Sequence, residues 1–119
     1  MNPSEHEIQK TVVQYLRVKH PDVEFYAIPN GGLRNIVVAK KLKAEGVVRG
    51  IPDLCIAEAC YGYHGMYLEL KAKDEKPTTE QKKKIKRLSK KGYFCRWADN
   101  VDDAINLIDG YLLGKELYR

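Results

Sequence analysis

Three residues with reactive side chains, Asp53, Glu69 and Lys71, lie in or beside apolar segments of the sequence. Asp53 directly precedes the apolar run Leu-Cys-Ile-Ala, whereas Glu69 and Lys71 alternate with leucines in the next such run. Because alternate residues of a strand point to the same side, Glu69 and Lys71 project from one face and Leu68 and Leu70 from the other. An acid and an amine are therefore expected together on one face of a sheet.

Pairing of these two apolar runs as neighbouring strands would bring the carboxylate of Asp53 close to that of Glu69. Two adjacent carboxylates repel each other at neutral pH, and a bound divalent cation is the usual way to relieve the repulsion. An all-oxygen ligand set favours Mg²⁺ or Mn²⁺ over Zn²⁺. Such an ion activates water and neutralises charge on a phosphoryl oxygen, and Lys71 would add a positive donor. The pattern predicts metal-dependent hydrolysis of a phosphodiester.

The elements that would position these residues follow from hydrophobic periodicity and turn signals. The pattern predicts helices at residues 4–20, 35–45, 78–91 and 100–113, and strands at residues 23–28, 53–57, 66–72 and 93–98. Strands 53–57 and 66–72 are expected to form a hairpin. This order predicts an α/β fold with a central mixed four-stranded sheet flanked by helices.

Length and composition narrow the class of protein. The chain has 119 residues, 44% of them hydrophobic and 31% charged, so we expect a single domain over residues 1–119. The formal charge of +5 favours an anionic partner without identifying it. Three cysteines without a ligand pattern are expected to be reduced, which indicates a cytoplasmic location. No apolar stretch approaches the length of a membrane span, so no membrane partner is expected.

Asp53 followed by Glu69-Leu70-Lys71, after an N-terminal helix, resembles the PD-(D/E)xK nuclease superfamily. More closely, the sequence from Ser4 to about Trp97 resembles the VRR-NUC domain, the virus-type replication-repair nuclease family. Five landmarks occur in the family's order: Glu7-Ile8-Gln9, Ile28-Pro29-Asn30-Gly31-Gly32 with Arg34, Gly50-Ile51-Pro52-Asp53-Leu54, Glu69-Leu70-Lys71, and Gln81.

The resemblance implies a restriction-endonuclease-like core and a site made from the matching residues. Glu7, Asp53 and Glu69 would act on Mg²⁺ or Mn²⁺, and the backbone carbonyl of Leu70 would be a further ligand. Lys71 would act in catalysis, with Gln81 in a supporting role. The implied activity is endonucleolytic cleavage of DNA, with branched or junction DNA as substrate, in phage-type replication and repair. No small-molecule cofactor is expected.

Two of these residues also have a simpler interpretation. Glu7 lies three residues after Ser4, and Gln81 lies three residues after Thr78, which is the spacing of a helix capping box. Either side chain could therefore cap its helix, support the site, or do both. Glu5 is close enough to Glu7 to compete with it as the acid of the first helix.

Several positions are candidates for contact with nucleic acid. The turn with Asn30, Gly31, Gly32 and Arg34 offers backbone amides and a guanidinium to a phosphate, although it could be only a turn. Between Lys71 and Arg96 there are eleven basic residues against three acidic ones. Such a run can be a solvated face or can follow a nucleic-acid backbone. The basic candidates are Arg49, Lys73, Lys82, Lys83 and Lys86.

The length of the chain also affects the oligomeric state that we expect. A specific DNA interface commonly buries about 1,000 Å² or more of protein surface, which is a large demand on a 119-residue chain. We therefore expect a symmetric homodimer, with the apolar C-terminal helix in part of its interface. The main alternative to a nuclease is a catalytically silent nucleic-acid-binding module with the same fold. That module would bind DNA without a metal ion.

Overall fold

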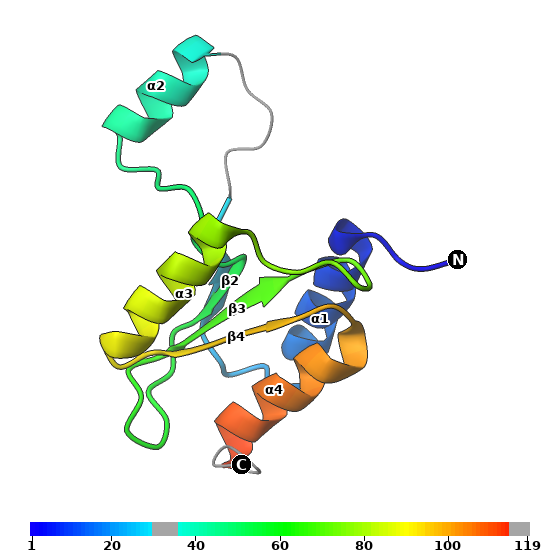
Figure 1. Cartoon of the computed structure of the whole chain (residues 1–119). Helices are drawn as coiled ribbons and strands as arrows, with labels where there is room; N and C mark the ends of the chain where they lie inside the picture. Colours follow the sequence, from blue (N-terminus) through cyan, green and yellow to red (C-terminus); the bar gives the residue numbers. More distant parts are fainter. Residues whose placement is uncertain (30–35, 115–119) are drawn as a thin grey trace.

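The computed structural model describes residues 1–29 and 36–114, which form four helices and four strands (Figure 1). Their order matches the order predicted from the sequence. In chain order they are α1 (Glu5–Lys19), β1 (Phe25–Ala27), α2 (Ile36–Ala44), β2 (Leu54–Ile56), β3 (Met66–Leu70), α3 (Thr79–Lys90), β4 (Phe94–Ala98) and α4 (Val101–Leu113). No helix in these two ranges is both long enough and apolar enough to span a bilayer.

The four strands form one mixed sheet in the order β1-β2-β3-β4. Strand β2 runs antiparallel to both of its neighbours, β1 and β3, and β4 runs parallel to β3 because the chain crosses over through α3 between them. The expected pairing of β2 with β3 is confirmed, with Cys55 opposite Tyr67. The predicted α/β fold with a central mixed sheet is therefore confirmed.

The core lies between one face of the sheet and the helices α1 and α4. Helix α1 contributes Ile8, Val12 and Leu16, which are spaced by four residues and so share one helix face. Helix α4 buries Ala104, Ile108 and Tyr111 in the same core. These apolar side chains pack within the chain, whereas Leu113 at the end of the helix is exposed, and the expected role of this helix in a subunit interface stays a prediction.

The opposite face of the sheet is covered less completely. Helix α3 packs on it over β4, and none of the residues of this helix is buried. In β3 the leucines point toward the core, so Tyr67 and Glu69 point toward the side of α3. The end of β3 beside the start of α3 is thus the place where polar side chains can gather next to solvent.

Candidate active site

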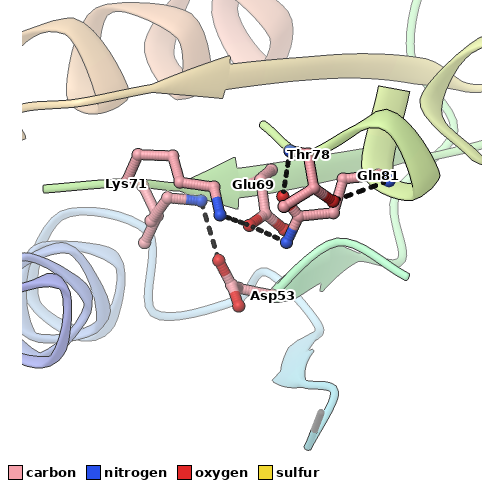
Figure 2. Close-up of polar contacts among 6 residues, drawn as sticks. Asp53, Glu69, Lys71, Thr78 and Gln81 are labelled. Carbon is pink, nitrogen blue, oxygen red and sulfur yellow. Dashed lines mark hydrogen bonds and ion pairs between the residues drawn. The ribbon is translucent and has the colours of Figure 1, made fainter. Parts of the chain in front are cut away.

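Asp53, just before β2, forms a hydrogen bond with the end of β3. Its Oδ2 accepts a hydrogen bond of 2.7 Å from the backbone amide of Leu70 (Figure 2). The N–H and C=O groups of one strand residue point to the same edge, so the Leu70 carbonyl faces the same side as the amide bound by Asp53. This contact holds the Asp53 carboxylate next to the strand that carries Glu69, as the sequence predicted.

Glu69 is almost fully buried, with 1% of its surface exposed. Its Oε2 accepts a hydrogen bond of 3.0 Å from Gln81 Nε2 and lies 3.5 Å from Lys71 Nζ. Its Oε1 is buried and has no hydrogen-bond partner among the described residues. Burial, reinforced by the charge of Asp53, raises the pKa of Glu69 to about 8, although Lys71 opposes the shift.

Lys71 directly follows β3, and its side chain is largely buried beside Glu69. Its backbone amide donates to the carbonyl of Ala98 at 2.9 Å, which continues the ladder between β3 and β4 by one residue. The backbone of Lys71 is therefore fixed by the sheet. A buried ammonium held in this way can offer a positive donor at a defined position beside the carboxylates.

Helix α1 brings Glu5, rather than Glu7, to this site. One carboxylate oxygen from each of Glu5, Asp53 and Glu69 can be chosen so that all three lie within 4.8 Å of one another. The pKa of Glu5 is raised mainly by partial burial, with a smaller contribution from the charge of Asp53 against the opposing effect of Lys71.

The prediction that Glu7 belongs to the metal site needs correction. Its Oε1 accepts a hydrogen bond of 3.0 Å from the backbone amide of Ser4. The backbone amide of Glu7 donates a hydrogen bond of 3.1 Å to Ser4 Oγ. These hydrogen bonds to Ser4 hold the pKa of Glu7 below its usual value. Residues two apart in a helix point about 200° apart, so Glu5 and Glu7 cannot serve the same site. The spacing from Glu5 to Ile8 and Val12 follows the buried stripe of α1, and this signal in the sequence favoured Glu5.

Gln81 has both of the uses that its spacing suggested. Its side-chain Oε1 accepts a hydrogen bond of 2.8 Å from the backbone amide of Thr78. Its backbone amide donates a hydrogen bond of 3.2 Å to Thr78 Oγ1, which completes a capping box. The remaining group of the side chain, Nε2, donates to Glu69 (Figure 2). The start of α3 is thereby tied to the carboxylate of β3.

The donor set fits a hard divalent cation. Glu5, Asp53 and Glu69 offer only carboxylate oxygens, and a backbone carbonyl at Leu70 faces the same edge of the strand. The unpartnered Oε1 of Glu69 is a buried acceptor that a cation would satisfy, since a buried polar atom without a partner is costly. Mg²⁺ and Mn²⁺ prefer such oxygen ligands.

The candidate nucleic-acid residues take different positions. Lys73, Lys82, Lys83 and Lys86 are exposed, the last three on α3. Arg49 is exposed and lies 3.7 Å from Glu80 at the start of that helix. The predicted turn with Asn30, Gly31, Gly32 and Arg34 lies outside the described residues.

Comparison with known proteins points to one family. No family model matches the sequence, and no curated protein matches it. A solved structure described as "VRR_NUC domain protein" superposes with a TM-score of 0.82 at 28% sequence identity. The alignment covers 95% of this chain and 91% of that one, so the likeness extends over nearly the whole length of both. In fold, and at 28% sequence identity over nearly its whole length, the chain is therefore similar to a VRR-NUC domain protein.

Proposed function

We propose that this protein is a Mg²⁺- or Mn²⁺-dependent endonuclease that hydrolyses phosphodiester bonds of DNA. The observation that carries the proposal is the buried, unpartnered Oε1 of Glu69 within a cluster of three carboxylates, beside the ammonium of Lys71. A protein that only binds DNA has no use for this expensive arrangement. The VRR-NUC name of the similar structure points to the same activity.

Each residue of the site has a chemical part in the proposed reaction. Glu5, Asp53, Glu69 and the carbonyl of Leu70 would hold the cation. When bound, the cation supplies charge neutralisation at the phosphate and lowers the pKa of a water molecule. Lys71 would donate to the attacking water or to a phosphate oxygen as negative charge develops there. Gln81 would keep Glu69 oriented so that its second oxygen stays directed at the cation.

The same proposal extends to substrate and assembly. We infer that the substrate is branched or junction DNA, in phage-type replication and repair, and that the protein acts as a homodimer. Two copies related by a twofold axis would present one site to each of two strands, which a chain of 119 residues cannot do alone. Exposed apolar side chains at Val47 and Val48 offer surface for such a contact.

The test is cleavage of a labelled panel with Mg²⁺, Mn²⁺ or EDTA, comparing wild type with Lys71→Ala. The panel contains linear duplex, single strand, flap, four-way junction and supercoiled plasmid. We expect cutting that requires the metal, is strongest on branched DNA and disappears in the variant. Absence of cutting with either ion, together with salt-sensitive DNA binding, would leave the silent binding module as the better account.

A further inference from the structure

The segment 36–52, here named the α2 arm, consists of helix α2 and the chain that returns from it to the body of the molecule (Figure 1). Its helix α2 projects away from the sheet, and none of the residues of this helix is buried. Ile36 and Val37 are 73% and 77% exposed. Helices of nine residues are marginal in water on their own, so a helix held in this position needs a partner.

The arm ends at the candidate active site, since its last residue, Pro52, directly precedes Asp53. The carbonyl of Asp53 also accepts a hydrogen bond of 2.8 Å from the amide of Ile28, which follows β1. The returning chain also packs on the first turn of α3. A Cβ at Gly50, whose φ is +82°, would lie 3.1 Å from the carbonyl oxygen of Glu80. The base of the arm is thus fixed between Asp53 and the start of α3.

The arm is also strongly basic. Residues 36–52 contain Lys40, Lys41, Lys43 and Arg49 against the single acid Glu45. All three lysines are exposed. Lys40 and Lys43 lie four and seven residues after Ile36, so these three residues form one stripe along the helix.

The less exposed side of α2 faces the base of the arm. Leu42 lines a cavity of about 460 Å³ together with Ile28, Pro29, Gly46, Val47, Val48 and Ile51. Around the helix Leu42 points about 160° away from Lys40 and about 100° away from Lys43, so neither lysine points toward this apolar base. The charge of these lysines is therefore directed outward, into solvent.

We propose that the α2 arm binds the sugar–phosphate backbone of DNA, as a second basic surface in addition to α3. This inference rests on the proposed nuclease function and extends it to how the substrate is held. Lys40, Lys41 and Lys43 would contact phosphates, which position a duplex without reading its sequence. A polyanion suits the lysines of helix α2 better than a second copy of the same basic helix, because like charges repel, whereas the apolar Val47 and Val48 lie at the base of the arm.

The test measures DNA affinity of the full chain in EDTA by fluorescence anisotropy over a salt series, so that cleavage is not required. The test variant is Lys40→Ala/Lys41→Ala/Lys43→Ala, and the matched control is Lys10→Ala/Arg17→Ala/Lys19→Ala on α1. Melting temperature and light scattering check that both remain folded and keep the oligomeric state of wild type.

We expect the arm variant to bind about tenfold or more weakly, with a salt slope shallower by about 2 to 3, and the control to bind like wild type. Replacement of the three lysines by arginine should retain the affinity, since either side chain binds phosphate. Unchanged affinity and slope in the arm variant would overturn the proposal. So would conversion of a dimer to a monomer, which would assign the arm to a subunit contact. Failure of wild type to cleave with any metal would instead refute the nuclease function.

Discussion

At the residue scale, the site depends on which acid of the first helix faces the sheet. Asp53, Glu69 and Lys71 could be identified from the sequence because alternation along a strand determines the face of each side chain. For the helix acid the sequence offered only a weaker signal, the spacing of Glu5 from the buried residues of α1. Both Glu5 and Glu7 precede the buried stripe of α1, and the family motif was matched to Glu7. The direction of the side chain separates them, because only Glu5 reaches the other carboxylates.

This assignment is tested by the isosteric pair Glu5→Gln and Glu7→Gln. Glu5→Gln removes a charged ligand, so we expect weaker Mn²⁺ binding and DNA cleavage reduced by about a hundredfold or more. Glu7→Gln should leave both close to wild type, because glutamine also completes a capping box. Calorimetric titration of Mn²⁺ and a plasmid cleavage assay measure the two effects. Loss of activity in Glu7→Gln with retention in Glu5→Gln would reverse the assignment.

Glu69 makes the stability of the metal-free protein depend on pH. Its pKa is about 8 in the folded protein, against an ordinary value of 4.5, so between these values the folded state holds a proton that the unfolded state releases. Burying this carboxylate therefore destabilises the fold increasingly as pH rises through that window. Glu69→Gln, which mimics the protonated form, should relieve the penalty at pH 8 and change little at pH 5.

The measurement is thermal unfolding of both proteins in EDTA at pH 5 and pH 8. We expect the gain in Tm from Glu69→Gln to be larger at pH 8 by about 4 °C or more. An equal effect at both pH values would mean that Glu69 is already ionised at pH 5.

At the element scale, α3 makes a contact with β3 that its own sequence does not predict. Its capping box could be predicted from the spacing of Thr78 and Gln81, because capping is a local interaction. The contact from Gln81 to Glu69 depends on how α3 packs against β3, and spacing along the chain does not determine that packing. The local and the tertiary roles therefore fall on different atoms of one side chain.

These two roles can be separated with Thr78→Ala and Gln81→Glu. Thr78→Ala loses the cap and should lower the free energy of unfolding by about 0.5 to 2 kcal/mol, with cleavage retained. Gln81→Glu keeps an acceptor for the cap but turns the donor at Glu69 into a second carboxylate. We therefore expect near-normal stability and strongly reduced cleavage. Chemical denaturation and the plasmid assay give the two readouts, and normal cleavage by Gln81→Glu would contradict a positioning role.

At the scale of the whole molecule, the order of elements and the mixed sheet were predictable because hydrophobic periodicity is strong in this chain. By contrast, the surface that the apolar face of the C-terminal helix covers was not predictable. Its apolar face could cover either the chain's own sheet or another subunit, and the pattern is the same for both. The structure buries most of that face in the core, whereas Leu113 on α4 and apolar side chains on the α2 arm are exposed.

The proposed homodimer is tested by multi-angle light scattering at micromolar concentration. We expect a mass of twice the 13.7 kDa chain, and a smaller apparent mass in Val47→Asp/Val48→Asp, because a charge on each exposed valine opposes burial. Leu113→Asp is the matched control, since this exposed residue lies on α4. A wild-type monomer would contradict the dimer, and dissociation in Leu113→Asp alone would return the interface to α4.

The central claim is that Glu5, Asp53 and Glu69 hold the catalytic cation beside Lys71. The most direct measurement is the anomalous scattering of Mn²⁺ in a crystal of the protein grown with that ion. The account predicts one strong peak within about 2.0 to 2.4 Å of carboxylate oxygens from these residues, with the Leu70 carbonyl in the same coordination shell. It also predicts that the peak disappears in Asp53→Asn. An ion bound elsewhere, or a cluster that stays empty while wild type cleaves DNA with Mn²⁺, would contradict it.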